Sequence, residues 1–205
     1  MRQIVQLEGS NVCGPVTAAM ILDHFGVPWD LDRLILRAAE MMGTSAELPR
    51  GTNDPVLASL LTEGGLLAFE SSLGHPMSKQ DDGRYFTRAH APRENRLATW
   101  YVVHQMLKTG WIAAAGIERD AGKLHWVAVD DAFIRAQERW FSVVCPIRGA
   151  YEEHAERFML DPNGKGDAED WVFARKRPAR FASAAEIAKL GDRIAGSEED
   201  APQTE

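Results

Sequence analysis

The order in which two hydrophobic periodicities follow each other along the chain most constrains its fold. In the first third, hydrophobic residues recur at helical spacing over 14–25, 31–42 and 53–64, and the last of these segments opens on Asn-Asp-Pro and closes on Gly-Gly. From residue 111 onward, short runs rich in β-branched and aromatic residues alternate with polar turns. Helices followed by strands, without alternation of the two, predict an α+β domain in which an N-terminal helical part packs on a C-terminal antiparallel sheet.

The middle and the end of the chain have weaker patterns. Residues 71–96 show no sustained hydrophobic period and predict an irregular surface segment, after which a helix is expected to run to residue 108. Asp-Pro-Asn-Gly at 161–164 is strong turn chemistry. A short helix is expected over 183–190. The expected strands are 111–117, 124–133, 140–144, 157–160 and 171–174.

The length and composition fit one domain. The chain has 205 residues, of which 45% are hydrophobic and 26% charged, so we expect a single domain over 1–195 and an acidic disordered tail over 196–205. The net charge of −7 gives no general attraction to nucleic acid or to anionic lipid. Neither a membrane-spanning run nor a signal peptide is evident, which predicts a cytoplasmic location without a membrane partner.

Cys13 is the first candidate for chemistry, because it lies where the chain enters the first expected helix. The unpaired amide groups at a helix start favour a thiolate, which is the form of cysteine that attacks carbonyl carbons. Gln6 lies seven residues upstream, and its amide can donate to the oxyanion of a tetrahedral intermediate, a contact worth about 3 kcal/mol. Gln3 is a less well placed substitute.

His125 is the candidate base. It lies near the start of an expected strand, where it shares a face with Val127 and Val129, and it can take the proton of a thiol and later give one to a leaving amine. Asp161 closes the expected strand 157–160 and can accept an N–H from the imidazole, which would fix its tautomer and direction. Asn163 and Asp130 are the alternative orienting residues.

These segments together resemble a known family. Gln6, Asn-Val-Cys-Gly-Pro at 11–15, His-Trp-Val-Ala-Val-Asp at 125–130 and Leu-Asp-Pro-Asn-Gly at 160–164 are similar to papain-like cysteine peptidases, and most similar to the bacteriocin-processing branch that cuts leaders after a double glycine. Over roughly residues 3–165, the resemblance implies the papain-like fold. It also implies the catalytic roles: oxyanion hole for Gln6, nucleophile for Cys13, base for His125 and orienting residue for Asp161.

A second alignment to the same family remains open. It places Cys145-Pro146 at the family's Asp-Pro position and leaves the triad without its carboxylate.

Three functions are compatible with this set of residues. The first is hydrolysis of a peptide or isopeptide bond in a peptide or protein substrate, with no metal or organic cofactor. The second is acyl transfer, because transglutaminases use the same Cys, His and Asp. The third is a catalytically inactive module that binds peptides. A zinc site is not expected, because no cysteine or histidine pair has the close spacing of metal ligands.

Overall fold

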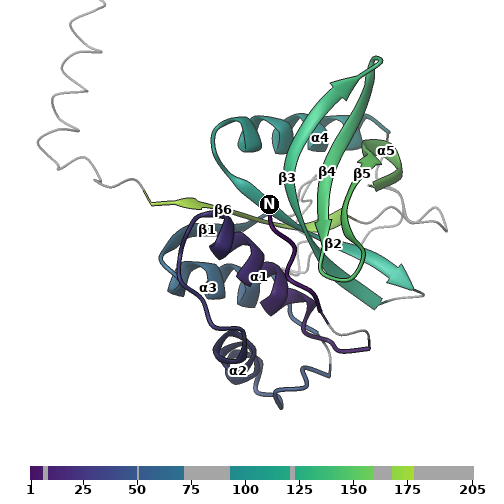
Figure 1. The fold of residues 1–205 in the computed structure, drawn as a ribbon. Coiled ribbons are helices and arrows are strands. Elements are labelled where there is room, and N and C mark those ends of the chain that lie inside the picture. The colour runs from purple at the N-terminus through teal and green to yellow at the C-terminus, as the bar shows by residue number, and fades with distance from the viewer. Residues whose placement is uncertain (7–8, 50, 72–92, 121–122, 159–167, 178–205) are drawn as a thin grey trace, which may run out of the picture.

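The computed structural model describes residues 1–6, 9–49, 51–71, 93–120, 123–158 and 168–177 (Figure 1). The helices in chain order are α1 Cys13–His24, α2 Leu31–Met42, α3 Asp54–Glu63, α4 Arg93–Lys108 and α5 Ala155–Phe158. The strands are β1 Leu66–Ser71, β2 Ile112–Asp120, β3 Lys123–Arg135, β4 Glu138–Cys145, β5 Gly149–His154 and β6 Ala168–Lys176.

The described strands form one six-stranded sheet in the order β1-β6-β2-β3-β4-β5. Every pair of neighbours is antiparallel. The last strand, β6, is inserted between β1 and β2, so the C-terminal part of the fold is paired with its earliest strand. Strands β3 and β4 form a long hairpin whose tip stands away from the helices (Figure 1).

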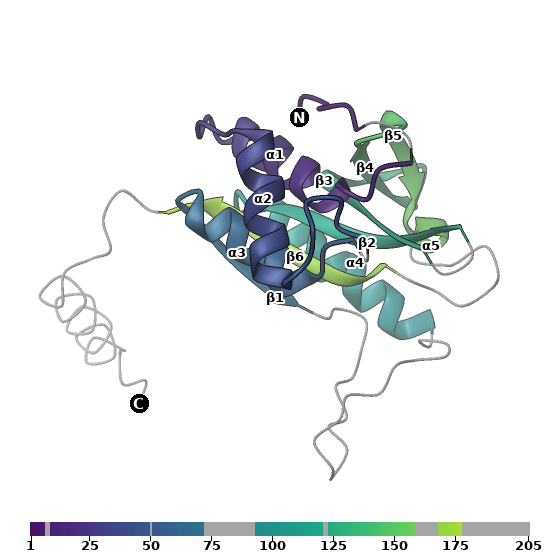
Figure 2. The ribbon, with the colours of Figure 1, turned by 90° about the horizontal axis from the view of Figure 1, so that it is seen from below.

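Alternation of side chains along β3 divides the core into two layers. Trp126 and Ala128 belong to a hydrophobic cluster shared with α1, α2 and α3. Val127 and Val129 belong to a second cluster, shared with α4 and α5. Figure 2 shows α1, α2 and α3 grouped together, apart from α4. The sheet therefore separates the N-terminal helices from the later ones.

Helix α1 is hydrophobic on all sides because it is covered on all sides. Its first ten residues, from Cys13 to Leu22, are all buried. It contacts α2, α3 and β3. Pro15 lies in its first turn, where a missing N–H costs no hydrogen bond. A buried helix with this packing gives its first residue, Cys13, a fixed position relative to β3.

The predicted helix boundaries in the first third are confirmed, and the reason is local. The Asp30 side chain accepts a hydrogen bond from the Arg33 amide at the start of α2. The Asn53 side chain accepts one from the Val56 amide at the start of α3. Such caps stabilise a helix by about 1 kcal/mol each. Gly43 ends α2 with a φ of 61°, in the left-handed region that glycine adopts without strain.

One predicted strand is wrong. We expected a strand over 157–160, but Arg157 and Phe158 are part of α5. Phe158 makes a ring contact with Phe141 of β4 at a centroid distance of 5.2 Å. The single helical turn of α5 places the Phe158 ring in this contact. The preceding strand β5 was not predicted, because its residues alternate between exposed and partly buried and few of them are hydrophobic. Strand β1 was not predicted either.

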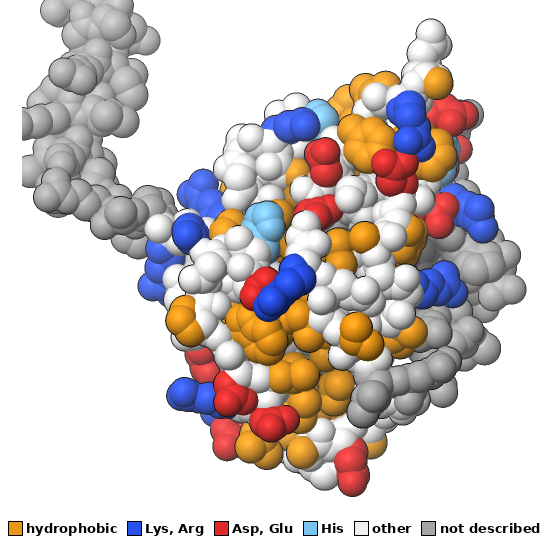
Figure 3. Space-filling view, in the orientation of Figure 1, with side chains coloured by type: hydrophobic (Ala, Val, Ile, Leu, Met, Phe, Trp, Pro, Cys, Tyr) orange, Lys and Arg blue, Asp and Glu red, His pale blue; other side chains and the backbone are white. Residues whose placement is uncertain are grey.

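Several predicted features lie outside the described residues. They are the turn over 161–164, the helix over 183–190, the acidic tail over 196–205 and most of the irregular segment 71–96. Within the described part, no helix is both long and hydrophobic enough to span a membrane. The face in Figure 3 carries acidic and basic side chains interspersed with hydrophobic ones.

Candidate active site

Cys13 is the first residue of α1, and only 5% of its surface is exposed. The residue before it, Val12, provides no side-chain cap to the helix start. Burial raises the pKa of the Cys13 thiol above its ordinary value, while hydrogen bonds from the backbone amides of Trp126, Gly14 and Cys13 itself oppose the rise. The sulfur therefore lies against the backbone of β3, beside the residue that follows His125. Because burial dominates, Cys13 needs a base to become nucleophilic.

Trp126 holds α1 and the segment before α3 to the strand that carries His125. Thr17 Oγ1 of α1 donates to the carbonyl oxygen of Trp126 at 3.2 Å. The indole Nε1 of Trp126 donates to the carbonyl oxygen of Thr52 at 2.6 Å. All four groups lie in buried surroundings, where each such bond contributes about 1 kcal/mol net and costs more if one partner is left unpaired. The position of Cys13 relative to β3 is thus fixed by hydrogen bonds as well as by packing.

Gly14 is required by a close approach of Thr52. A Cβ added at Gly14 would lie 2.5 Å from Thr52 Cβ and 2.7 Å from Thr52 Oγ1, closer than real Cβ contacts. The segment before α3 is therefore seated directly on the first turn of α1. The glycine after Cys13 is therefore explained by the packing of Thr52 against it as well as by the proposed role of the Cys13 thiol.

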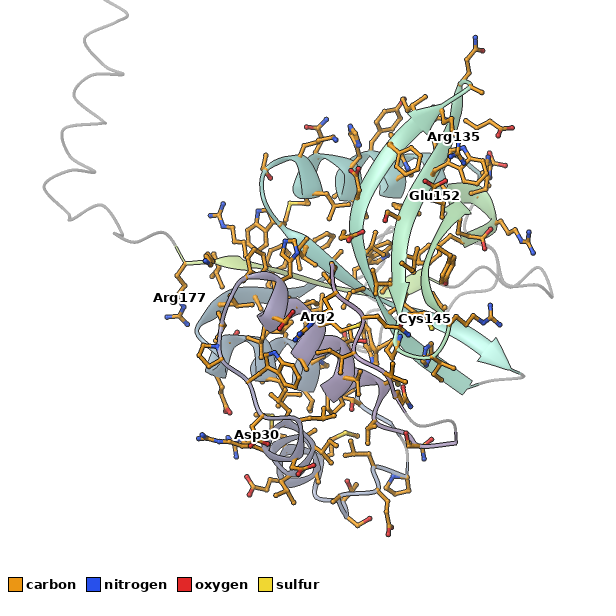
Figure 4. The ribbon with its side chains drawn as sticks, viewed as in Figure 1. Arg2, Asp30, Arg135, Cys145, Glu152 and Arg177 are labelled. Atoms are coloured by element: carbon orange, nitrogen blue, oxygen red, sulfur yellow. The ribbon has the colours of Figure 1, made fainter. Side chains whose placement is uncertain are left out.

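His125 lies near the start of β3 and is 6% exposed. It pairs with Ile117 of β2. Its Nε2 lies 3.3 Å from Cys145 Sγ. Cys145 is the last residue of β4, at the end of the strand remote from the hairpin tip (Figure 4). Since Cys145 belongs to the same cluster as Val127 and Val129, the alternation of β3 explains why the imidazole meets this sulfur.

The sulfur of Cys145 accepts two further hydrogen bonds. The backbone amides of Ile147 and Arg148 donate to it at 3.4 and 3.3 Å. A side chain that accepts the amides two and three residues later is typical of aspartate and asparagine at the start of a turn. Burial, and after it an electrostatic interaction with Cys145, raises the pKa of Tyr151 to about 12. An electrostatic interaction with Cys145 also contributes, after burial, to the rise in the pKa of Cys13.

Gln6 is buried beside the same turn. Its backbone amide donates to the carbonyl oxygen of Pro146 at 3.0 Å. Its side-chain Nε2 donates to the carbonyl oxygen of Ser10 at 2.5 Å and to Ser10 Oγ at 3.2 Å, while its Oε1 is buried and has no hydrogen-bond partner among the described residues. Gln3 holds the turn from the other side, because its Nε2 lies 3.3 Å from the carbonyl oxygen of Cys145. The N-terminal segment is therefore attached to the Cys145 turn.

The three candidate orienting residues differ in where they lie. Asp130 Oδ2 accepts a hydrogen bond from the Met1 amino group at 2.8 Å, and Met1 packs against the cluster that contains Trp126, so Asp130 is engaged away from the face of His125. Asp161 and Asn163 lie outside the described residues.

Cys145 was not among the three predicted candidates, although a signal for it was present. That signal is the Cys145-Pro146 pair, which the second alignment places at the family's Asp-Pro position. The contact between Cys145 Sγ and His125 Nε2 favours this second alignment. Over the described ranges, no group of three or more histidine, cysteine, aspartate or glutamate side chains is arranged to hold a metal ion.

Comparison with known proteins shows a shared fold without close sequence relationship. No protein-family model and no curated protein matches the chain. Among solved structures, the peptidase domain of Streptococcus ComA, a bi-functional ABC transporter involved in quorum sensing, matches with a TM-score of 0.51 and 13% identity, over 85% of this chain and 97% of that one. A double glycine motif protease from an AMS/PCAT transporter, in complex with a leader peptide, matches with a TM-score of 0.50 and 15% identity, over 85% and 91%.

The predicted fold is confirmed by these matches. Both neighbours are peptidase domains of the branch that the sequence resembles, and both are covered over almost their whole length. The helices packed on an antiparallel sheet form an α+β domain with the fold of these peptidase domains. Identities of 13% and 15% carry the fold only, so the activity has to be argued from the residues.

Proposed function

We propose that the protein is a cysteine peptidase in which Cys13 is the nucleophile and His125 the general base. The observation that carries the proposal is the position of the Cys13 sulfur, against the backbone amide of Trp126, the residue that follows His125 in β3. The supporting context is the peptidase fold, in which the thiol at the start of a buried helix and the histidine at the start of a strand come from distant parts of the chain.

The reaction follows from the state of the thiol. Because burial raises the pKa of Cys13, the resting sulfur keeps its proton near neutral pH. His125 accepts that proton as the sulfur forms a bond to the carbonyl carbon of the substrate, and returns it to the nitrogen of the leaving amine when the C–N bond breaks. Water then hydrolyses the thioester, which releases the acid and restores the thiol. General-base assistance of this kind is worth about 10²- to 10⁴-fold in rate.

The oxyanion is proposed to be stabilised by the Cys13 backbone amide and the Gln6 side chain. The start of α1 has no side-chain cap, so its first amides are directed toward the position of the sulfur. The Gln6 amide donates to Ser10, and it must exchange that partner for the substrate oxygen to play this role. One such donor is typically worth about 3 kcal/mol in the transition state. Asp161 is proposed from the family resemblance alone.

The proposed substrate is a peptide or protein in which a peptide or isopeptide bond is cleaved. One structural neighbour is a double glycine motif protease in complex with a leader peptide, which makes peptides containing Gly-Gly the first substrates to test. Acyl transfer to an amine, and peptide binding without turnover, are the competing outcomes of the same experiment.

The first test is turnover of an internally quenched peptide library that includes Gly-Gly sequences. We expect cleavage by the wild type and a loss of about 10³-fold or more in the Cys13→Ala variant, with peptide binding retained. Cleavage by Cys13→Ala at the wild-type rate contradicts the assignment of the nucleophile. Equal binding by both proteins without any turnover supports a binding module, and product captured by an added amine in preference to water supports acyl transfer.

The second test needs no substrate. The rate of alkylation of Cys13 by iodoacetamide, located by peptide mass mapping, is compared between the wild type and His125→Ala near neutral pH. Because burial raises the pKa of Cys13, a higher alkylation rate in the wild type than in His125→Ala measures proton acceptance by His125. Equal rates in two folded proteins contradict the proposed pairing.

A further inference from the structure

We propose that Cys145 is the positioning residue of His125, in the place that a carboxylate occupies in the peptidases this chain resembles. The inference rests on the proposed function, since an orienting residue matters only if His125 is the base. Its starting point is the 3.3 Å contact between His125 Nε2 and Cys145 Sγ, two buried side chains on the same face of neighbouring strands.

The surroundings of the sulfur favour one direction for this hydrogen bond. Cys145 Sγ already receives the backbone N–H groups of Ile147 and Arg148, so it lies where an acceptor is required. The imidazole Nε2 completes the set by donating its own N–H to the same sulfur. That places the ring proton on Nε2 and makes Nδ1 the basic nitrogen. A fixed tautomer with a basic Nδ1 is what a general base needs from its orienting residue.

The turn that carries Cys145 is held in place from several directions. Pro146 fixes the backbone φ after the cysteine. The carbonyl oxygen of Pro146 accepts the Gln6 backbone amide, and that of Cys145 accepts the Gln3 side chain. Only 2% of Cys145 is exposed, so the sulfur has little room to turn away from the imidazole. The contact with His125 is therefore built into the fold and does not depend on an exposed side chain.

The same geometry explains why the position accepts a thiol in place of a carboxylate. The two amides of the turn are the donors that an aspartate side chain would accept at this position, and the histidine is the third. The sulfur lies within hydrogen-bonding distance of all three, and a thiol accepts more weakly than a charged oxygen. A carboxylate introduced at residue 145 should therefore keep the contacts and strengthen the bond to His125.

The experiment measures alkylation of Cys13 by iodoacetamide across the pH range in which imidazole titrates. The variants are Cys145→Ala, which removes the acceptor, Cys145→Asp, which restores a carboxylate, and Asp161→Asn as the matched control for the competing orienting residue. We expect Cys145→Ala to lower the rate by about 10- to 100-fold and to remove the limb of the pH profile that reports His125. Cys145→Asp should retain that limb, displaced to higher pH because a carboxylate stabilises the imidazolium.

The outcomes separate this inference from the proposed function. If His125→Ala alkylates at the wild-type rate, the proposed function fails and no orienting residue is needed. If His125 matters but Cys145→Ala keeps the pH limb while Asp161→Asn loses it, Asp161 is the orienting residue and the inference is overturned. Alkylation at Cys145 instead of Cys13, dependent on His125, overturns both. Unfolding curves of each variant identify any loss of rate that comes from misfolding, and Cys145→Asp then supplies the decisive comparison.

Discussion

Replacing Gly14 by alanine tests whether packing around Cys13 is as tight as the structure shows. The added Cβ would lie 2.5 Å from Thr52 Cβ, 2.7 Å from Oγ1 and 2.9 Å from Cγ2. Because Thr52 Cβ is fixed to the backbone, the strain is relieved only if the segment before α3 moves. Overpacking of this kind costs about 1–3 kcal/mol. Alanine gains about 1 kcal/mol over glycine in a helix interior, so the expected net loss of unfolding free energy is about 0–2 kcal/mol.

A double-mutant cycle with Thr52→Gly isolates the clash. Thr52→Gly removes all three atoms that the new Cβ would meet, so Gly14→Ala should become neutral or stabilising in that background. The assay is urea unfolding of the four proteins, with Cys13 alkylation as a second readout of a displaced first turn. Coupling between the two substitutions should reach about 1–3 kcal/mol. Coupling below about 0.5 kcal/mol refutes the reasoning.

Two further substitutions test the surroundings of the site. Trp126→Phe should lose about 1–3 kcal/mol of unfolding free energy in urea, because it leaves the buried Thr52 carbonyl without the indole donor; an unchanged midpoint contradicts this. Tyr151→Phe tests burial beside Cys145. The folded protein keeps the phenol proton up to a pKa of about 12, so wild-type stability should fall, relative to Tyr151→Phe, as pH rises from about 10, by at most about 1.4 kcal/mol per pH unit. Parallel pH curves for the two proteins contradict it.

The sequence predicts the helical third of the fold well because its signals are local. Asn53 caps α3 from within its own turn, and Gly43 ends α2 by a conformation that needs no distant partner. The sheet depends on distant partners. Strand β5 carries Tyr151 between polar residues, so its weak alternation becomes a strand only through pairing with β4. Phe158 is hydrophobic in either conformation, and its contact with Phe141 favours the helical turn over the predicted strand.

The candidate site likewise combines residues with local sequence signals and contacts that depend on distant parts of the chain. The proposed roles of Cys13 and His125 can be predicted from the sequence, because a thiol at a helix start and a histidine at a strand start are local patterns. The partner of His125 cannot be read in this way. Asp161 follows from its place after an expected strand and from the family resemblance, whereas the contact in the structure depends on the register of β3 and β4 and on the direction of two amides after Cys145.

The end of β4 and the turn after it contact both of the groups proposed to assist Cys13. The sulfur of Cys145 contacts His125, the proposed base, while the carbonyl oxygens of Cys145 and Pro146 hold the N-terminal segment that carries Gln6, the proposed oxyanion donor. A movement of the turn would therefore displace both proposed groups together. This coupling explains how a thiol can stand where a carboxylate is expected: the backbone amides of the turn fix the place of the acceptor, and a weaker acceptor in a fixed place still selects the tautomer of His125. The strength of Cys145 as an acceptor then sets the proton affinity of His125. The position of the Cys145 sulfur sets the direction of the imidazole ring.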